Sequence, residues 1–199
     1  MLCGYETWIC SCAARLHVLV AALVVVGCGD SPNVPTAVSP ADGRVIFVTS
    51  QTVSGDFGGV ASADALCASL ATAARLPGSF RAWLSGGGLS PSATFSRGPT
   101  PFVMTSGVRV ADHWDDFADG TINNPIIVDE RGVQPASVDQ VWTGTDTGGV
   151  PAASGASCGD WQSLVGTGQV GAFDQIGPGW SAAGIRPCDQ PARLYCVEQ

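Results

Sequence analysis

The sequence contains no lysine, because all nine of its basic residues are arginines, and these face seventeen aspartates and glutamates. The formal net charge is therefore -8 at pH 7. A protein of this charge repels the phosphate and sulfate groups of polyanions. Nucleic acid and heparin-like polymers are thus excluded as expected partners.

Groups that carry catalysis are also scarce. Of two histidines, only His113 lies outside the apolar N-terminal region, and its neighbour Asp112 would point away from it on a strand. The run GTGQVG at 166–171 matches Gly-x-Gly-x-x-Gly, but no helical pattern follows, so we interpret it as a flexible loop. Ser157 is interpreted as an ordinary neighbour of a bridged cysteine. We therefore expect that the protein is not an enzyme.

The N-terminal segment has the pattern of an export signal. Arg15 precedes the apolar run LHVLVAALVVVG, which is short for a bilayer span and suits a secretory signal over residues 1–27. The run ends in VVGC, which resembles the lipobox of bacterial lipoproteins, in which Cys28 would be the lipid-modified first mature residue. A plain signal peptide and a permanent membrane helix are the alternatives.

Residues 28–43 contain three prolines and small polar residues without apolar periodicity. This composition predicts a flexible tether. With Cys28 lipidated, the protein would be exported and anchored in the bacterial cell envelope, and we expect the outer rather than the inner membrane.

Residues 44–199 are expected to form one domain, because the chain is too short for two comfortable cores. Its 26 glycines and 13 prolines favour many turns and short strands. One convincing helix is predicted over 62–76, with Ser62 as its cap, Cys67 on its apolar face and Pro77-Gly78 as its stop. Residues 146–191 are expected to be rich in loops. Strands are expected in RVIFVTS, FRAWLS, PFVMT, VRVAD, PIIVD, QVWTGT and ARLYCVE.

Four of the eight cysteines lie in this domain, and four cysteines allow three pairings. None has the Cys-x-x-Cys spacing typical of zinc sites, and export favours disulfides over free thiols. We favour the nested pairing as a hypothesis. It joins Cys67 to Cys196, tying the helix to the last strand, and Cys158 to Cys188, closing the loop-rich region on itself.

Short stretches of the domain resemble a known family. VWTGTDTGG at 141–149, CGDW at 158–161 and CDQPARLYCVEQ at 188–199 resemble endostatin-like domains of the C-type lectin-like superfamily. The order of RVIFVTS, GDFGGVASADALC, RAWLS, WDDFADG, PIIVDERG and RLYCVEQ resembles a bacterial family of endostatin-like lipoproteins whose domain has no assigned function. The resemblance covers residues 44–199.

This resemblance implies an α+β fold of the C-type lectin-like, endostatin-like kind, with short antiparallel strands, one main helix and two nested disulfides. Some spirochaete members of the family are adhesins for host matrix and complement proteins, which implies a binding role. The calcium and sugar motifs of sugar-binding lectins are not matched, since Gln190-Pro191-Ala192 lacks the needed carboxylate.

The densest polar cluster is DHWDDFADG at 112–120. Its carboxylates, with two that follow, could bind calcium through hard oxygen ligands, or they could serve turns by accepting hydrogen bonds from backbone amides. The candidate calcium ligands are Asp115, Asp116, Asp119, Asp129 and Glu130. Trp161 and Trp180 lie in the loop-rich region, where they could be exposed anchors for a ligand or could cover the core.

The function expected from the sequence is non-catalytic binding or adhesion, with a protein or a matrix-like ligand. The alternatives are a calcium-dependent carbohydrate-binding module with a non-standard site and a structural envelope lipoprotein. No cofactor is expected except calcium in the first alternative.

Overall fold

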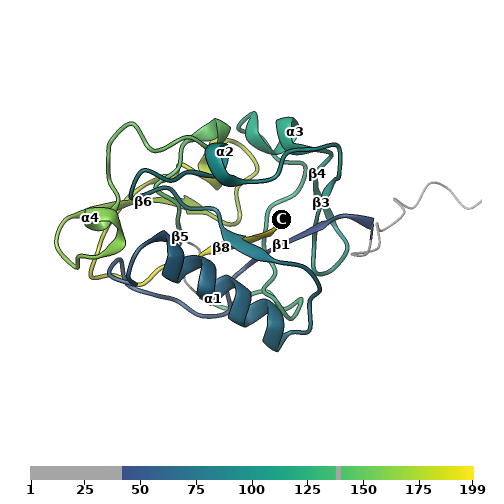
Figure 1. Ribbon diagram of the computed structural model, residues 1–199, viewed down its shortest axis with the longest axis horizontal. Coiled ribbons are helices and arrows are strands. Elements are labelled where there is room, and N and C mark those ends of the chain that lie inside the picture. The colour runs from purple at the N-terminus through teal and green to yellow at the C-terminus, as the bar shows by residue number, and fades with distance from the viewer. Residues whose placement is uncertain (1–41, 138–139) are drawn as a thin grey trace, which may run out of the picture. The chain divides into compact units, whose positions relative to one another are not determined.

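The computed structural model describes residues 42–137 and 140–199, and its central element is the first strand (Figure 1). The strand β1, Arg44–Val48, is buried along its length after Arg44. Val45 and Phe47 pack into one hydrophobic core, whereas Ile46 and Val48 pack into another. Because side chains alternate between the faces of a strand, this continuous apolar run reflects burial on both faces.

β1 lies in the middle of a five-stranded sheet with the order β2-β8-β1-β3-β4. The other strands are β2 (Phe80–Ala82), β3 (Phe102–Met104), β4 (Arg109–Ala111) and β8 (Tyr195–Glu198). Their positions confirm four of the expected strands. The expectation of antiparallel strands is wrong for one pair, because β1 and β3 are parallel. The main helix, a strand and a single helical turn lie between them in the chain, which is the long crossover that parallel strands need.

A second, antiparallel sheet consists of β5 (Gln140–Trp142), β6 (Thr167–Ala172) and β7 (Gly184–Pro187). β6 and β7 show that the region expected to be loop-rich contains two paired strands. The interpretation of GTGQVG as a flexible loop is therefore wrong. Two of its glycines reflect close packing, since a β-carbon at Gly168 would be 2.8 Å from the ring of Trp142, and one at Gly171 would collide with the backbone of Trp180.

The main helix is α1, Val60–Ala73, and it begins two residues earlier than expected. Gly59 is its N-cap, and no side chain caps it. Ser62 lies in the first turn and donates its hydroxyl to Gly58 O at 3.1 Å, so the prediction that Ser62 caps the helix is wrong. Two glycines with positive φ, Gly58 and Gly59, allow the earlier start.

α1 also ends earlier than Pro77-Gly78. Arg75 has a φ of 60°, its amide donates to Thr72 O at 3.0 Å, and the amide of Leu76 donates to Ala71 O at 2.9 Å. These two bonds form a Schellman motif, which satisfies the last carbonyls of a helix. The helix therefore ends through its own backbone before the proline is reached.

The other helical elements are single turns. They are α2 (Pro91–Thr94), α3 (Trp114–Ala118), α4 (Cys158–Trp161) and the 3-10 turns η2 (Thr147–Gly149) and η3 (Pro178–Trp180). The strand expected in PIIVD is absent from the described residues. There the amide of Ile127 donates to Pro125 O at 3.0 Å, and this tight turn takes the segment out of sheet pairing.

The two cores lie on opposite faces of the five-stranded sheet. One core gathers around Trp83, whose ring contacts Phe117 at 4.8 Å and Trp180 at 4.9 Å between centroids. The other contains the buried face of α1 and Trp142 of the second sheet. Trp83, Trp142 and Tyr195 are all fully buried in these cores.

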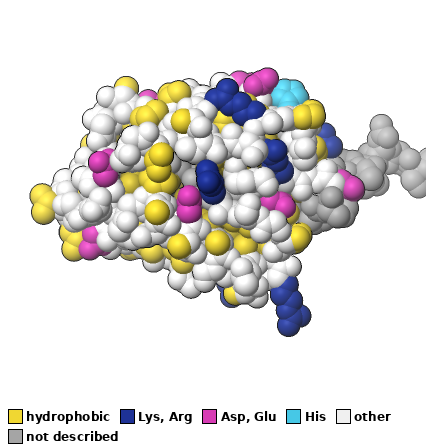
Figure 2. Space-filling model, in the orientation of Figure 1, with side chains coloured by type: hydrophobic (Ala, Val, Ile, Leu, Met, Phe, Trp, Pro, Cys, Tyr) yellow, Lys and Arg dark blue, Asp and Glu magenta, His cyan; other side chains and the backbone are white. Residues whose placement is uncertain are grey.

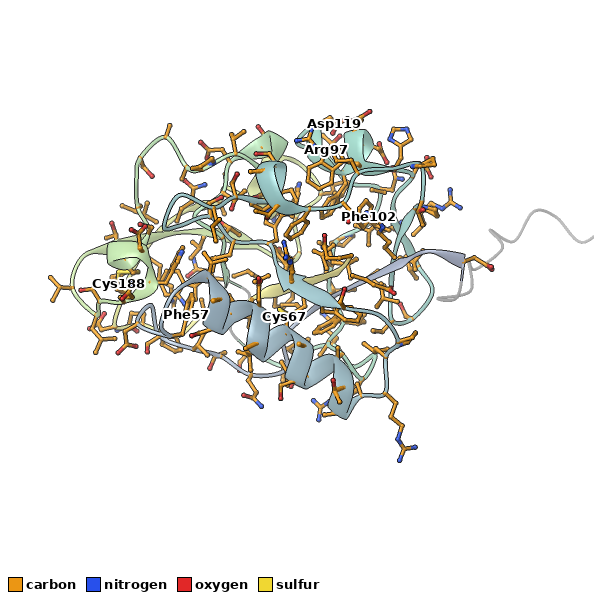
Figure 3. The ribbon with its side chains drawn as sticks, in the orientation of Figure 1. Phe57, Cys67, Arg97, Phe102, Asp119 and Cys188 are labelled. Atoms are coloured by element: carbon orange, nitrogen blue, oxygen red, sulfur yellow. A yellow bond between two sulfur atoms is a disulfide. The ribbon has the colours of Figure 1, made fainter. Side chains whose placement is uncertain are left out.

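Two disulfides cross-link the second core. Cys67 of α1 is bonded to Cys196 of β8, and Cys158 of α4 is bonded to Cys188, with Cα–Cα distances of 5.4 and 5.6 Å. The nested pairing is therefore confirmed. Figure 3 shows Cys67 on the side of α1 that faces the sheet and Cys188 beside α4.

The domain is thus an α+β fold with few helices, two sheets and two disulfides. Its disulfides indicate an exported, non-cytoplasmic protein. Within residues 42–137 and 140–199, no helix is long and apolar enough to cross a membrane. The predicted signal at 1–27, Cys28 and nearly all of the predicted tether at 28–43 lie outside the described residues.

We expect the two disulfides to contribute unequally to stability. The loop-entropy relation gives about 5 kcal/mol for the separation of 129 residues between Cys67 and Cys196, and about 4 kcal/mol for the 30 residues between Cys158 and Cys188. Urea unfolding of the Cys67→Ala/Cys196→Ala and Cys158→Ala/Cys188→Ala variants of the full chain measures both losses. A larger loss for the second variant would contradict the expected order.

Candidate functional site

The strongest local departure from ordinary backbone geometry is the turn α4. Cys158, Gly159, Asp160 and Trp161 have φ values of 50°, 60°, 57° and 65°, so four successive residues are left-handed. Each non-glycine residue in this conformation costs roughly 1–2 kcal/mol, because its β-carbon approaches the following carbonyl oxygen. Such strain persists only where surrounding contacts fix it, and it gathers at functional sites.

The contacts that fix this turn come from both of its ends. Cys158 is held by its disulfide, and the indole of Trp161 is fully buried and donates from Nε1 to Ser85 O at 2.8 Å. The carbonyl of Trp161 accepts the amides of Gly58 and Gly59 at the start of α1, at 2.9 and 3.1 Å. The strained turn is therefore anchored to a helix, a hairpin and a disulfide.

Asp160 joins this turn to a hairpin tip, residues 85–89. Gly86 and Leu89 exchange backbone hydrogen bonds of 3.1 and 3.0 Å, and Gly87 and Gly88 between them have φ values of 58° and 79°. These values define a type I′ turn, which requires positive φ at both central residues. Asp160 Oδ1 accepts the amide of Gly87 at 2.8 Å, so its carboxylate is fixed against the tip.

Two hollows border the hairpin tip, and we call the two together the tip groove. The larger hollow, of about 300 Å³, is bordered by the tip, by Gly144, Pro151 and Ala152, by residues 155–157 and by Asp160. The smaller, of about 200 Å³, is bordered by the tip, by the first residues of α1 and by Asp160. Asp160 is the only charged side chain among the described residues that line either hollow.

A buried polar network supports the larger hollow from beneath. Ser85 Oγ and Thr145 Oγ1 lie 2.9 Å apart, and Thr145 O accepts hydrogen bonds from Gln169 Nε2 at 2.9 Å and Ser181 Oγ at 2.8 Å. A satisfied buried network of this kind holds the surrounding backbone in one arrangement. The groove is therefore preformed.

No protein-family model matches this chain. A comparison with curated proteins also finds no similar sequence. The function must therefore be argued from the groove and from the sequence motifs themselves.

Trp161 and Trp180, the candidate ligand anchors, are both in the core. Their side chains are 0% and 1% exposed, which leaves no ring surface for a partner, so the exposed-anchor interpretation is wrong and the alternative, that they belong to the core, is confirmed. Trp161 instead lies under the tip groove, since a β-carbon at Gly86 would be 2.7 Å from its Nε1. The ring of Phe57 stacks on it at 5.4 Å, and Figure 3 shows Phe57 at the start of α1.

Three candidate calcium ligands belong to the cluster around α3. Asp116 accepts the amide of Asp112 at 2.6 Å, and Asp119 accepts both the amide and the hydroxyl of Thr121 at 2.8 Å. Asp115 is exposed and borders a hollow near His113. Two of the three carboxylates thus serve turns, which was the alternative interpretation of this cluster.

The remaining two candidate calcium ligands are buried, and both pair with Arg131. Asp129 pairs with it at 2.6 Å and Glu130 at 3.8 Å, and Glu130 also accepts the amide of Ser50 at 3.0 Å. Burial raises the pKa of Asp129, but the Arg131 guanidinium and the amides of Val133 and Arg131 outweigh it, so this pKa is lowered overall. Among residues 42–137 and 140–199, no three acidic, histidine or cysteine side chains form a group that could hold a metal.

His113 has a structural role in the described fold. Its Nδ1 accepts the amide of Asp116 at 3.1 Å, which makes it the N-cap of α3. It borders a hollow with Arg97 and Trp114, and it does not border the tip groove. His113, the residue considered as a catalytic base, therefore does not line the tip groove with Asp160.

The sequence reasoning missed the residues that build the groove. GASCG at 155–159 matches Gly-x-Ser-x-Gly, and its Ser157 borders the larger hollow rather than being merely a neighbour of Cys158. Ser157 Oγ accepts the amide of Asp160 at 3.3 Å, and its φ of -138° is not that of a strained nucleophile. The run Gly86-Gly87-Gly88 was the signal that could have located the tip, because adjacent glycines favour a type I′ hairpin.

Two substitutions of Asp160 should separate its backbone role from its charge. Asparagine tolerates left-handed φ and keeps an acceptor for Gly87 N, so Asp160→Asn should change the free energy of unfolding by less than about 0.5 kcal/mol. Alanine keeps the strain and removes the acceptor, so Asp160→Ala should cost about 1–2 kcal/mol. Urea unfolding of both variants measures the difference, and equal stabilities would show that Asp160 does not hold the hairpin tip.

Proposed function

We propose that this chain is the non-catalytic binding domain of a bacterial envelope lipoprotein, and that its ligand is a protein held at the tip groove. The proposed fold is C-type lectin-like and endostatin-like. Its support is the order of sequence motifs over residues 44–199, together with an α+β domain that has two nested disulfides.

The observation that carries this proposal is the strained turn that fixes Asp160 against the hairpin tip. Three left-handed non-glycine residues are unfavourable for folding, and the domain keeps them beside a hollow of about 300 Å³. The hollow has a preformed floor and one oriented polar group. These are the usual properties of a binding site.

A binding role fits the chemistry of the groove better than catalysis does. Ser157 is hydrogen-bonded within the turn, and the histidine of the domain caps α3 elsewhere. A serine nucleophile requires an adjacent base to remove its proton. No histidine, lysine or cysteine lines the tip groove among the described residues. The carboxylate oxygen beside Ser157 Oγ, Asp160 Oδ1 at 3.5 Å, already accepts the amide of Gly87 at 2.8 Å.

The charge distribution is consistent with a protein ligand rather than a polyanion. On the face shown in Figure 2, acidic and basic side chains are scattered among neutral ones, without a broad basic field. The formal net charge of -8 acts in the same direction.

Lipid anchoring at Cys28 is part of the same proposal. The disulfides support export, and VVGC after an apolar run supports lipidation in the envelope, with the outer membrane as the proposed location. We expect the chain made in a bacterial host to fractionate with membranes and to carry the mass of a diacylglyceryl group on Cys28. Cys28→Ala should abolish that mass. An unlipidated wild-type chain would contradict the anchor and leave the groove proposal intact.

The binding function is tested with the detergent-solubilised full chain against two arrays, one of extracellular-matrix and serum proteins and one of glycans. We expect saturable binding to a protein that Asp160→Asn weakens at least tenfold. The control Asp115→Asn removes the same charge from an exposed site on α3 and should bind as the wild type does. Binding to glycans alone, with calcium required, would favour the carbohydrate-binding alternative and overturn the protein ligand.

A further inference from the structure

We infer that the larger hollow of the tip groove receives a basic side chain, lysine or arginine, of the protein ligand, and that Asp160 Oδ2 binds its charged head group. This inference rests on the proposed function, and it names the chemical feature that the groove selects.

The larger hollow is negatively charged, because Asp160 is its only charged lining residue in the described part of the chain. Oδ1 accepts Gly87 N at 2.8 Å, whereas the described residues offer Oδ2 no hydrogen-bond donor. A carboxylate oriented in this way can accept a charge-assisted hydrogen bond from an ammonium or guanidinium group.

The walls of the larger hollow include the apolar side chains of Leu89, Pro151 and Ala152, and the Leu89 side chain is 46% exposed. Lysine and arginine cover apolar surface with their methylene stems while their charged ends reach a polar partner. The apolar side chains of the hollow can contact the methylene stem of such a residue, and the Asp160 carboxylate can bind its charged end.

The size and openness of the hollow suit a single side chain. Its volume of about 300 Å³ lies at the lower end of the range for ligand pockets, roughly 300–1,000 Å³. Gly88 and Gly155 both line the hollow, and a β-carbon added to either residue would meet no atom within 4 Å. Space for an entering group is therefore present at both positions.

Asp160 is held in place by neighbouring residues at three points. Its amide is held by Ser157 Oγ, its carboxylate by Gly87 N, and its backbone by the buried Trp161 that follows. A carboxylate that is already ordered loses little conformational entropy when a ligand binds. The acidic net charge of the chain also favours encounter with a basic partner.

The probe for this inference is Nα-acetyl-arginine methylamide, with the citrulline analogue as a neutral control of nearly the same shape. Each is titrated to tens of millimolar into the 15N-labelled full chain. The amides of Gly86 and Gly87 and the indole N–H of Trp161 report on the groove. We expect the arginine probe to shift these signals saturably, with an apparent Kd at least about tenfold lower than that of citrulline. The lysine probe should rank with arginine.

Three variants make the test specific. Asp160→Asn should reduce the arginine response to the citrulline level, and Asp115→Asn should leave it unchanged. Gly88→Asn accepts positive φ and places a side chain at the mouth of the hollow, so it should weaken both probes. Unchanged dispersion of the remaining signals confirms folding in each case.

Equal responses to arginine and citrulline, no saturable response to either, or an undiminished arginine response in Asp160→Asn would overturn the inference. If a protein ligand from the array binds Asp160→Asn and wild type equally while Gly88→Asn abolishes binding, a protein is still held at the tip groove, but the role of Asp160 and the basic side chain are excluded. If no array ligand binds but the arginine response depends on Asp160, the hollow still selects a basic group, and the part of the proposal that assigns this group to a protein is overturned.

Discussion

Burial of the Trp161 indole is the interaction on which the candidate site depends. One side chain stacks on Phe57, contacts Trp142 at 5.6 Å between ring centroids, and donates a hydrogen bond to Ser85. Its backbone carbonyl holds the start of α1. Because these contacts come from three separate segments, residues 57–59, Ser85 and Trp142, they fix the residue in a left-handed conformation that it would otherwise avoid. The orientation of Asp160, one position earlier, follows from this arrangement.

The carboxylates of the domain divide into two kinds. Asp116, Asp119, Asp129 and Glu130 accept hydrogen bonds from nearby amides or hydroxyls and thereby stabilise turns. Asp160 also holds a turn, but with one oxygen only, and its second oxygen faces no described donor. Because the first kind is engaged in turns, the described residues contain no group of acidic side chains fit for a metal, and Asp160 is the carboxylate that lines the tip groove.

The sequence predicted those parts of the fold that depend on apolar patterning. RVIFV alternates between two cores, and Cys67 lies on the buried face of α1, so the first strand and the helix-to-strand disulfide could be predicted. The parallel pairing of β1 with β3 depends on how distant segments meet, and no local pattern reveals it.

The candidate site could not be predicted from the sequence for a related reason. Asp160 matters because of a left-handed backbone, and an aspartate in that conformation has the same sequence signature as one in any other turn. The burial of Trp161 and Trp180 likewise follows from tertiary packing rather than from the glycine-rich composition around them.

The place of β8 in the sheet has a consequence for biogenesis. This strand, Tyr195–Glu198, lies between β2 and β1 and carries Cys196, although nearly the whole described domain separates it from β1 in the sequence. Neither neighbouring strand can complete its pairing until β8 has been synthesised, and contacts of such long sequence separation form slowly. The five-stranded sheet and the disulfide of longest separation therefore close together, as late steps in the folding of the domain.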